Sequence, residues 1–293
     1  MNTPLVSVLM AAYNSEKYIA EAIESVLASS YSNFELIICD DRSTDNTGAI
    51  AKSYAKIDNR ISIYTNEKNL GDYPNRNRVA SYAKGKYLKY LDHDDVLYKY
   101  SLDYMVEAME KYSDAVLGIS FSILNDEMRY PNYNSPAHCI RTEFLGVPFL
   151  GSGPSSAIIS RDAFVKSGGF LEKDFVGDQE LWLRLAKVGG VVKLQPSLNW
   201  YRIHEAQESN RERKSIVNQH VRYLISLDIL ELNKEFFSEK EIEFIIKKIK
   251  RNQARNILKS IILDKKLKDG IELCKKCKLS FFELLNGFKP FIK

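Results

Sequence analysis

The chain of 293 residues is 45% hydrophobic and 27% charged, which are ordinary proportions for a folded globular protein, so extensive disorder is excluded. Its four cysteines are too few for a disulfide-stabilised scaffold, and a net charge of +4 over the whole chain is too small to indicate a nucleic-acid partner, so none is expected. The first residues lack the basic and apolar segments of a signal peptide, and no apolar run reaches the roughly 18 residues of a membrane span. These features favour a cytoplasmic protein.

The N-terminal third of the chain alternates short apolar runs with amphipathic segments. The apolar runs predict strands at Leu5–Ala12, Phe34–Cys39, Ile61–Thr65 and Lys86–Leu91. Apolar residues at helical spacing predict helices between them, at Glu16–Ser29, Asp45–Lys56 and Pro74–Ala83. This alternation is typical of a parallel, doubly wound sheet with right-handed crossovers.

The pattern becomes less regular beyond the fourth strand. Helices are predicted at Leu102–Tyr112, Arg161–Ser167 and Asp178–Lys187, and strands at Ala115–Ser122, Ser155–Ser160, Gly190–Leu194 and Leu198–Ile203. From about Arg211 the chain is helical in pattern and rich in isoleucine, leucine, lysine and glutamate. We therefore predict an α/β domain over residues 1–210 and a helical appendage over residues 211–293.

Polar residues follow the first, second and fourth predicted strands at their carboxyl ends, which is where ligands bind to sheets of this kind. These residues are Tyr13, Asp40, Asp41 and Asp92. One tyrosine and three carboxylates are therefore expected along one edge of the sheet.

The segment Asp92-His93-Asp94-Asp95 directly follows the fourth predicted strand. Three carboxylates within four residues repel one another, so they must either face water or share a cation. Mg²⁺ or Mn²⁺ held by carboxylates typically also binds substrate phosphates. The alternative is a solvated acidic turn in which Asp95 caps the next helix, and the local sequence leaves both interpretations open.

The turn after the second strand is also open to two interpretations. Ser43, Thr44 and Asp45 suit a turn and a helix cap. In a nucleotide site, Asp40 or Asp41 would instead accept a hydrogen bond from a base N–H. The ring of Tyr13, which follows the first strand, would stack on a base in such a site. Its alternative is an ordinary surface aromatic in a chain with 17 tyrosines.

Taken together and in this order, the motifs resemble those of the family 2 inverting glycosyltransferases with the GT-A fold. The resemblance covers about residues 4–210. The matching motifs are Val6-Ser7-Val8, Ala12-Tyr13-Asn14, Tyr18-Ile19, Ala22–Leu27, Asn33–Ile38, Asp40-Asp41-x-Ser43-Thr44-Asp45, Asn69-x-Gly71, Arg76-Asn77, Ala83–Tyr87, Asp92–Asp95, Gly168-Gly169-Phe170, Gly177–Leu185 and Tyr201-Arg202-x-His204. The resemblance implies a Rossmann-like mixed central sheet flanked by helices, followed by the helical appendage.

The resemblance also implies where the sugar nucleotide binds. In this family the base and ribose lie near the end of the first strand and the turn with two aspartates, and UDP is the frequent nucleotide. The matching positions of this chain are Ala11, Tyr13, Asp40, Asp41, Arg76, Asn77 and Asp92.

The residues that match the reaction centre are carboxylates and one histidine. Asp92-x-Asp94 matches the D-x-D motif, which contacts the ribose and, through a divalent metal, the diphosphate. Asp94 is the expected ligand of Mn²⁺ or Mg²⁺, and His204 matches a histidine that completes the metal shell in many GT-A enzymes, its alternative being a surface histidine in a loop. Asp178 matches the general base, which would take the proton of the attacking hydroxyl while the metal offsets the charge of the leaving diphosphate.

Three departures from the family pattern stand out. Ala11 replaces the usual proline, Arg42 replaces the usual glycine after the two aspartates, and Gly177 stands where an acidic residue commonly precedes the base. The Gln-x-x-Arg-Trp signature of processive polysaccharide synthases is absent after Asp178. We therefore expect a hexosyltransferase-type enzyme that adds one sugar per encounter to a saccharide or lipid-linked acceptor of a bacterial-type surface glycan.

Two other functions fit part of this pattern. A sugar-phosphate nucleotidyltransferase has a related sheet, but it needs a glycine-rich basic loop after the first strand, which Ala11–Lys17 lacks. A nucleotide-sugar-binding scaffold without catalysis is disfavoured because Asp92, Asp94, Asp178 and His204 occur together.

The charge of the chain is unevenly distributed. Residues 244–293 hold fourteen lysines and arginines and four acidic residues, a net +10, which leaves −6 for residues 1–243. With its phenylalanines, isoleucines and leucines, this segment suits a basic amphipathic appendage that docks on an anionic membrane face. A helical cap with solvated lysines is the alternative, and the two can coexist, so the protein is expected in the cytoplasm or peripherally on the inner face of the membrane.

Overall fold

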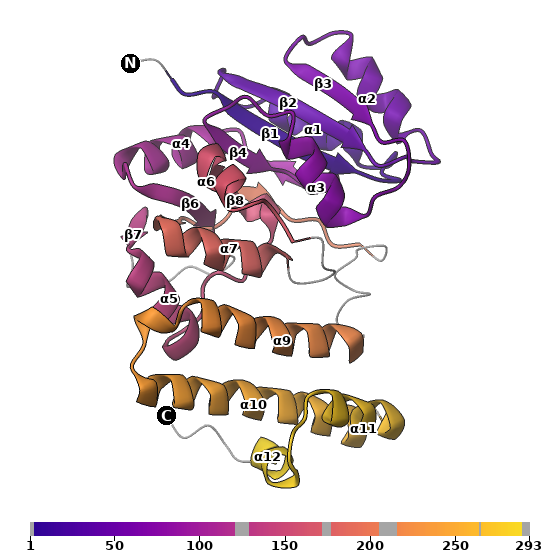
Figure 1. Cartoon of the computed structure of the whole chain (residues 1–293). Coiled ribbons are helices and arrows are strands. Elements are labelled where there is room, and N and C mark those ends of the chain that lie inside the picture. Colours follow the sequence, from indigo (N-terminus) through magenta and orange to yellow (C-terminus); the bar gives the residue numbers. More distant parts are fainter. Residues whose placement is uncertain (1–2, 121–128, 172–176, 205–215, 264, 289–293) are drawn as a thin grey trace. The chain divides into compact units, whose positions relative to one another are not determined.

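The computed structural model describes residues 3–120, 129–171, 177–204, 216–263 and 265–288 (Figure 1). Contacts between Cα atoms divide the chain into two compact units. The first consists of Met1–Glu143, Val147–Lys173 and Gly177–Ile203, and the second of Phe144–Gly146, Asp174–Val176 and His204–Lys293. The expected domain boundary at residues 210 and 211 lies outside the described residues.

A mixed sheet forms the centre of the first unit. Among the described residues, eight strands are ordered β3-β2-β1-β4-β8-β6-β9-β7. Their bounds are β1 Val6–Ala12, β2 Phe34–Asp40, β3 Ile61–Thr65, β4 Tyr87–Tyr90, β6 Ala115–Ser120, β7 Asn132–Asn134, β8 Ala157–Ser160 and β9 Gly190–Leu194. Strands β1 to β4 pair in parallel, whereas β8 is antiparallel to both β4 and β6. The predicted mixed sheet is therefore confirmed.

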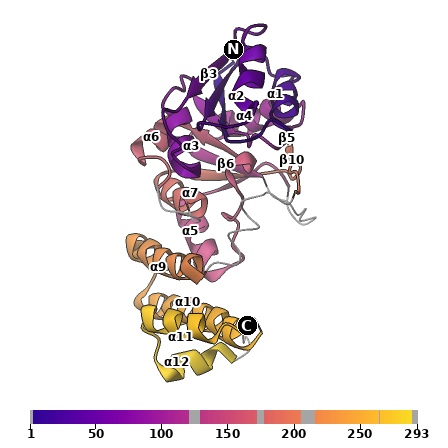
Figure 2. The same cartoon turned by 90° about the vertical axis from the view of Figure 1, so that its right-hand side faces the viewer.

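Helices cover both faces of this sheet (Figure 2). The helices are α1 Ile19–Leu27, α2 Thr47–Ala55, α3 Asp72–Ala80, α4 Ser101–Lys111, α5 Pro136–Leu145, α6 Arg161–Lys166 and α7 Gly177–Val188. Side chains of α1, α2 and α4 pack in one cluster with alternate residues of β1. On the opposite face Tyr90 of β4 packs against Phe164 of α6 and donates a hydrogen bond to the backbone of α3.

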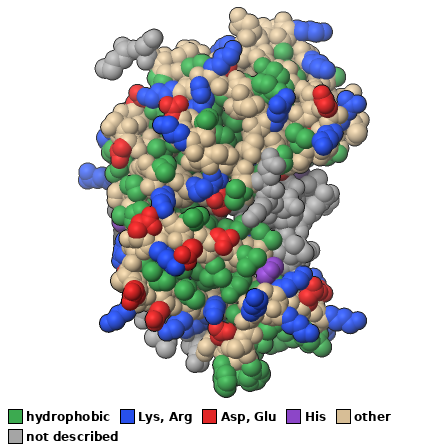
Figure 3. Space-filling model, viewed as in Figure 1, with side chains coloured by type: hydrophobic (Ala, Val, Ile, Leu, Met, Phe, Trp, Pro, Cys, Tyr) green, Lys and Arg blue, Asp and Glu red, His purple; other side chains and the backbone are tan. Residues whose placement is uncertain are grey.

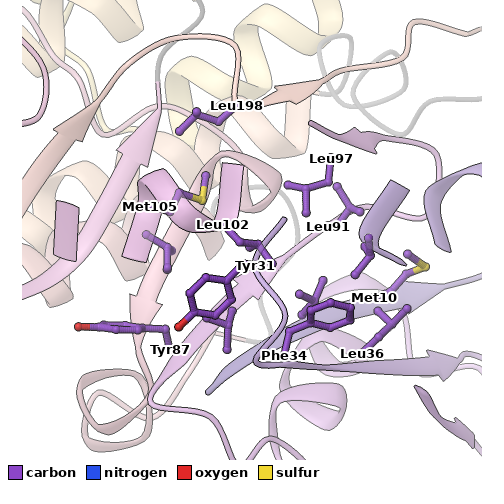
Figure 4. Packing of buried hydrophobic residues seen from close by; sticks show 14 of the residues in the cluster. Met10, Tyr31, Phe34, Leu36, Tyr87, Leu91, Leu97, Leu102, Met105 and Leu198 are labelled. Atoms are coloured by element: carbon purple, nitrogen blue, oxygen red, sulfur yellow. The ribbon is translucent and has the colours of Figure 1, made fainter. Parts of the chain in front are cut away.

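Strand β1 is a nearly continuous apolar run because it is buried on both faces, one of which packs against α1, α2 and α4. Val8 and Met10 of β1 contact the cluster that includes Phe34, Leu36 and Met105 (Figure 4). Leu9, between them, is fully buried on the other face. Because both faces of the parallel part are covered, every residue of the strand except one is buried, as a two-sided sheet requires.

The structure differs from the predicted pattern in the less regular middle of the chain. The strand expected at Leu198–Ile203 is reduced to β10, Asn199–Trp200, which pairs with the unpredicted β5, Val96–Leu97, in a separate small sheet. The strand expected from Ser155 begins at Ala157, because Pro154–Ser156 form a 3-10 turn. Elements this short have too few residues for a periodic pattern to identify them.

The second unit is helical in its described part, as predicted for the appendage. Its helices are α9 Ile216–Leu232, α10 Glu239–Ile262, α11 Leu267–Lys276 and α12 Phe281–Leu285. Ser238 caps α10 in a capping box with Glu241, and Ser280 caps α12 in the same way with Glu283. A small core around the fully buried Ile257 joins α9, α10 and α11.

Two lysines of the basic segment, Lys289 and Lys293, lie outside the described residues. Among the residues that are described, no helix combines the length and the apolar character that crossing a bilayer requires.

Candidate functional site

The loops that follow β1 and β2 are joined side by side at the edge of the sheet. The backbone N–H of Asn14 donates to the Ser43 hydroxyl, and the Asn14 side chain accepts from the backbone N–H of Thr44, each at 2.9 Å. Tyr13, between this asparagine and β1, is 45% exposed. Its ring is therefore accessible, while Ala11 lies half-buried in β1.

Asp41 is buried and its carboxylate holds the loop that leads into α3. The Asn66 amide and the Leu70 backbone N–H donate to its Oδ1 at 2.7 and 2.8 Å, and the Gly71 N–H donates to its Oδ2 at 2.9 Å. A carboxylate has about four acceptor positions. These three bonds therefore leave room for one from a base N–H, so the loop-holding role and the nucleotide role of Asp41 are compatible.

Asp40 is buried as well, but it organises its own turn. Its Oδ1 accepts a hydrogen bond from the backbone N–H of Ser43 at 3.1 Å. This is the local turn interaction that the sequence offered as the alternative to base recognition. Asp40 therefore stabilises the turn, and this bond, like the three bonds of Asp41, leaves acceptor positions for a base N–H.

Arg42 explains one departure from the family pattern, because its φ is 64°. This left-handed backbone conformation suits the glycine that is usual at the position and costs an ordinary residue about 1–2 kcal/mol. Replacing Arg42 by Gly is therefore expected to raise the free energy of unfolding by about 0.5–1 kcal/mol, after allowing for the larger unfolded-state entropy of glycine. Thermal unfolding of Arg42→Gly and Arg42→Ala would test this, since alanine removes the same side chain but keeps the strain. Equal stability of the two variants would contradict it.

Arg76 of α3 links two carboxylates at the carboxyl end of β4. Its guanidinium lies 2.8 Å from Asp72 Oδ1 and 2.7 Å from Asp92 Oδ1. Burial opposes its charge, yet Asp72 and Asp92 together hold the pKa of Arg76 well above its ordinary value. Burial would likewise raise the pKa of Asp92, but the Arg76 guanidinium more than offsets this and holds it below its usual range. Asp92 is therefore kept ionised beside a fixed positive charge.

The turn after Asp92 is anchored to the 3-10 turn Pro154–Ser156. The backbone N–H of Asp92 donates to the Ser155 hydroxyl at 2.8 Å, and the buried Lys89 ammonium donates to the backbone carbonyls of Tyr90 and Ser155. Burial lowers the pKa of Lys89 to about 8, against the opposing effect of nearby aspartates. A buried cation and a hydroxyl thus hold two loops of the site together.

Arg202 holds the same acidic turn from the side of β10. Its Nε donates to the backbone carbonyl of Asp94 at 2.8 Å, and its backbone N–H donates to Asp95 Oδ1 at 3.2 Å. Its guanidinium also pairs with Glu21 of α1. The Tyr-Arg-x-His motif matches the family, but the sequence assigned its arginine no role. In the structure this arginine binds the turn that contains Asp94 and Asp95.

The acidic turn fits a divalent cation that is shared with a substrate. Among the described residues, the buried atoms Asp95 Oδ2 and His93 Nδ1 have no hydrogen-bond partner, so the protein leaves polar groups next to Asp94 unsatisfied. Burial and the charge of Asp92 raise the pKa of Asp95 to about 7. No group of three His, Cys, Asp or Glu side chains gathers in the described part of the chain. The residues present therefore fit a cation held by one or two carboxylates together with a diphosphate.

His204 begins the C-terminal segment of the second compact unit, whereas Asp92 and Asp94 belong to the first. The structure describes it as a half-buried residue that follows β10 and Arg202.

Asp178 is the second residue of α7, where the helix N-terminus favours a negative charge. It is half-buried, and its Oδ1 accepts the backbone N–H of Gln179 at 2.7 Å. Glu180, two residues further, is buried and pairs with Arg184 at 2.6 Å. The two acidic residues of this turn thus differ, because Glu180 is buried and paired with Arg184, whereas Asp178 is partly exposed.

Helix α3 connects these parts of the site. Asn77 exchanges two hydrogen bonds with the backbone of Phe170, at 2.8 and 2.9 Å, so it holds the Gly168-Gly169-Phe170 segment. Trp182 of α7 is fully buried and donates to the backbone carbonyl of Ser152. The candidate nucleotide residue Asn77 is therefore a structural neighbour of the site.

Five further residues contact candidate-site residues but were not among the site residues predicted from the sequence: Asp72, Tyr73, Lys89, Ser155 and Arg202. The signal for Asp72 and Tyr73 was available in part, since residues four apart on a helix share a face with Arg76 and Asn77. No local pattern marks Lys89, which lies within an apolar strand.

Comparison with known proteins identifies relatives of the chain. A model of the family described as Glycosyl transferase family 2 matches residues 7–167. The Escherichia coli protein "UDP-Glc:alpha-D-GlcNAc-diphosphoundecaprenol beta-1,3-glucosyltransferase WfgD" is 28% identical over 222 residues, 75% of this chain and 85% of WfgD. The match to the family includes Asp41, Arg76, Asp92 and Asp94 and ends before Asp178.

Solved structures with the same fold are more distant in sequence. S. aureus TarS in complex with UDP-GlcNAc superposes with a TM-score of 0.71 at 19% identity, over 93% of this chain and 80% of TarS. Glucosyl-3-phosphoglycerate synthase from Mycobacterium tuberculosis, in complex with Mn²⁺ and UDP, gives a TM-score of 0.55 at 17% identity, over 77% of this chain and 80% of that chain. The GT-A fold expected from the sequence is thereby confirmed.

Proposed function

The chain belongs to glycosyl transferase family 2 and is a glycosyltransferase, and from this premise we propose the reaction that it catalyses. One sugar moves from a UDP-sugar to a hydroxyl of a saccharide or lipid-linked acceptor. The reaction uses a divalent cation and inverts the configuration at the anomeric carbon. The observation that carries the proposal is the position of α3. This helix contacts the acidic turn through Arg76 and the first turn of α7 through Tyr73, so it connects Asp92 with Asp178.

The nucleotide would bind along the loops that follow β1 and β2. Tyr13 offers an exposed aromatic face to the base, and Asp41 has an acceptor position left for a base N–H. The UDP and UDP-GlcNAc bound by family neighbours of the same fold support a uridine nucleotide.

The diphosphate would reach the turn that contains Asp92 and Asp94. Asp94, with Asp92 beside it, would hold Mn²⁺ or Mg²⁺ jointly with phosphate oxygens, and we extend the ligand set to His204 on the family pattern. The cation, when bound, supplies Lewis-acid stabilisation of the leaving diphosphate. Arg76 keeps Asp92 ionised and fixed in direction, while Lys89 and Ser155 hold the turn in place. The bound Mn²⁺ of a structural neighbour supports this role.

The acceptor hydroxyl would attack the anomeric carbon from the face opposite to the diphosphate. Asp178 would take the hydroxyl proton as general base, for which it must lie within about 3 Å of that oxygen. The new glycosidic bond forms as the bond to the diphosphate breaks, so the configuration inverts. The relative WfgD, whose name describes a lipid-linked saccharide acceptor, supports an acceptor of that class.

UDP release is the direct test of this function. Wild-type protein with MnCl₂ and UDP-glucose, UDP-galactose or UDP-GlcNAc should release UDP, slowly with water and faster with a diphosphate-linked saccharide acceptor. Proton NMR of the product should show an anomeric configuration opposite to that of the donor. Retention of configuration would contradict the inverting mechanism, and release of no UDP from any donor would contradict the transferase function.

We also propose that the appendage, residues 211–293, docks on an anionic membrane. Among the described residues of its C-terminal end, Phe281, Phe282 and Phe288 are 69%, 77% and 62% exposed. Exposed lysines of α11 lie near them in the sequence, and Figure 3 shows hydrophobic and basic side chains gathered where Figure 1 labels α10 to α12. Aromatic side chains with surrounding lysines suit the interface of an anionic bilayer.

Flotation with liposomes tests this docking. Full-length protein is expected to float with vesicles that contain phosphatidylglycerol, to bind less in high salt, and to stay behind with phosphatidylcholine alone. The double variant Phe281→Ser, Phe282→Ser should lose most of the binding, whereas Ile57→Ser, which removes an equally exposed apolar residue from the first unit, should not. Equal binding of both variants would contradict a role for these phenylalanines.

A further inference from the structure

The ring of Tyr73 lies against the backbone of Gly177, the residue before Asp178. A Cβ atom placed on Gly177 would come within 2.8 Å of Cε1 and Cζ of the Tyr73 ring and 2.9 Å of Cε2. Contacts this close do not occur between unstrained carbon atoms, so Gly177 has no side chain because the tyrosine ring fills that space. Tyr73 and Gly177 therefore form a matched pair across 104 residues of sequence.

The ring is held in this place by its other neighbours. It stacks on Phe170 with centroids 5.4 Å apart and planes 27° apart. Phe170 is itself almost fully buried, packs against Trp182, and has its backbone fixed by the two hydrogen bonds of Asn77. Because the neighbours of the ring are packed and hydrogen-bonded, Tyr73 cannot retreat from Gly177 without disturbing several buried groups.

The hydroxyl end of Tyr73 reaches the first turn of α7. Burial, and then the charges of Asp178 and Asp72, raise the pKa of the Tyr73 hydroxyl, so it is protonated at neutral pH. The backbone N–H of Asp178 lies near the phenol oxygen and lowers the pKa, in the direction opposite to those charges. The side chain of Tyr73 thus contacts both the residue that precedes Asp178 and the backbone of Asp178 itself.

The same helix carries Arg76, one turn further along α3, which pairs with Asp92. The Tyr73 contact and the Arg76 contact therefore place Asp178 and the acidic turn relative to one rigid helix. Geometry held by a helix rather than by a loop is the usual way to fix a reacting group to within a fraction of an ångström.

We propose that Tyr73 is the positioning residue for Asp178: its ring fills the place left by the missing acidic side chain at position 177, and its hydroxyl fixes the first turn of α7, so that the base faces the acceptor at a set distance from the acidic turn. The proposal rests on the proposed function, since it assigns a role to a neighbour of the candidate base. It accounts for the glycine at position 177 as a consequence of the tyrosine at position 73.

The Tyr73→Phe variant tests the hydroxyl. It keeps the ring and removes the polar interaction between the hydroxyl and the backbone N–H of Asp178. The loss of one such interaction corresponds to roughly a 3- to 10-fold effect on a rate that depends on it. The assay measures UDP release with water as acceptor and MnCl₂ present, from the donor that the wild-type protein hydrolyses fastest. We expect kcat to fall by that factor. The Kd of UDP with Mn²⁺, measured by calorimetry, should change by less than about 2-fold, since the nucleotide contacts are elsewhere. Tyr64→Phe, which removes a hydroxyl from a stacked tyrosine of β3, is the matched control and should leave kcat unchanged.

A double-mutant cycle tests the ring. Gly177→Ala should lower kcat at least as much as Tyr73→Phe, because its Cβ displaces either the ring or Asp178. In a Tyr73→Ala background the same Gly177→Ala change should cost little, since the obstructing ring is absent, and such non-additivity is the signature of direct contact. Additive effects of the two changes would overturn the matched pair.

The outcomes separate this proposal from the function on which it rests. If Asp178→Asn abolishes UDP release while Tyr73→Phe behaves as wild type, the positioning role is wrong and the function stands. If Tyr73→Phe lowers kcat, UDP affinity and Tm together, the tyrosine acts on stability alone and the proposal is overturned. If Asp178→Asn releases UDP at the wild-type rate, the assignment of the base fails, and the role of Tyr73 fails with it.

Discussion

Replacing Asp178 by Asn is expected to lower the rate of sugar transfer by about 10²–10⁴-fold, the range that a general base contributes. Asparagine keeps the shape of the side chain and can still accept the Gln179 N–H, so the start of α7 should be preserved. It cannot take a proton from the attacking hydroxyl. The affinity for UDP with Mn²⁺ should therefore remain close to that of the wild-type protein, because the nucleotide is bound by other elements.

Asp162 provides a matched control for this experiment. It is the second residue of α6, as Asp178 is of α7, and it is exposed. Asp162→Asn removes a carboxylate from an equivalent helix position and should affect only stability, by about 0.3–1 kcal/mol. Steady-state rates and calorimetric titrations with UDP would be compared for the two variants. Equal loss of rate and of UDP affinity in Asp178→Asn would contradict a role as base.

Replacing Asp94 by Asn should have the second largest effect, and it should act through the metal. A neutral amide is a poor ligand for Mn²⁺ or Mg²⁺, which prefer charged carboxylate oxygens. We expect transfer to fall by about 10²-fold or more, since the leaving diphosphate would lose its principal charge stabilisation. Unlike Asp178→Asn, this variant should also lose the increase in UDP affinity that Mn²⁺ gives to the wild-type protein.

The measurement is a calorimetric titration of UDP at several MnCl₂ concentrations. Asp228→Asn, which changes an exposed aspartate of α9, is the control and should retain the full dependence on Mn²⁺. An Asp94→Asn protein whose UDP affinity still rises with Mn²⁺ as in the wild type would show that the cation is held by other residues.

The first four strands could be predicted from the sequence because they are continuous apolar runs separated by periodic helices. Their carboxyl ends could be predicted for the same reason, and with them the positions of Tyr13, Asp41 and Asp92. In contrast, β5 and β10 have two residues each, and their pairing depends on a contact between segments about a hundred residues apart. No local pattern contains that information.

The contacts that organise the candidate site were hidden from the sequence for a similar reason. The pairing of Arg76 with Asp92, and the packing of Tyr73 on Gly177, join residues that have no fixed spacing along the chain. Motif matching placed Arg76 and Asn77 together near the nucleotide. The structure separates them, because Arg76 pairs with the acidic turn while Asn77 binds the backbone of Phe170.

Arg42 and Gly177 show what departures from a motif can mean. Arg42 keeps the left-handed backbone of the glycine it replaces, so the turn survives at a cost in stability. Gly177 instead leaves the space that the ring of Tyr73 occupies. A substitution in a motif is therefore interpretable only when its backbone angle and its spatial neighbours are known.

Binding of a uridine nucleotide sugar in the presence of Mn²⁺ tests the proposed function most directly. Thermal unfolding and calorimetry would be measured for the full-length protein with UDP-glucose, UDP-galactose, UDP-GlcNAc and, for comparison, GDP-mannose, each with and without MnCl₂. At least one UDP-sugar should raise Tm with Mn²⁺ present, since a ligand at 100 times its Kd adds about 2.7 kcal/mol to the stability of the folded state. Failure of every nucleotide sugar to bind or to stabilise the protein, with Mn²⁺ or without it, would contradict the assignment of this chain as a nucleotide-sugar-dependent transferase.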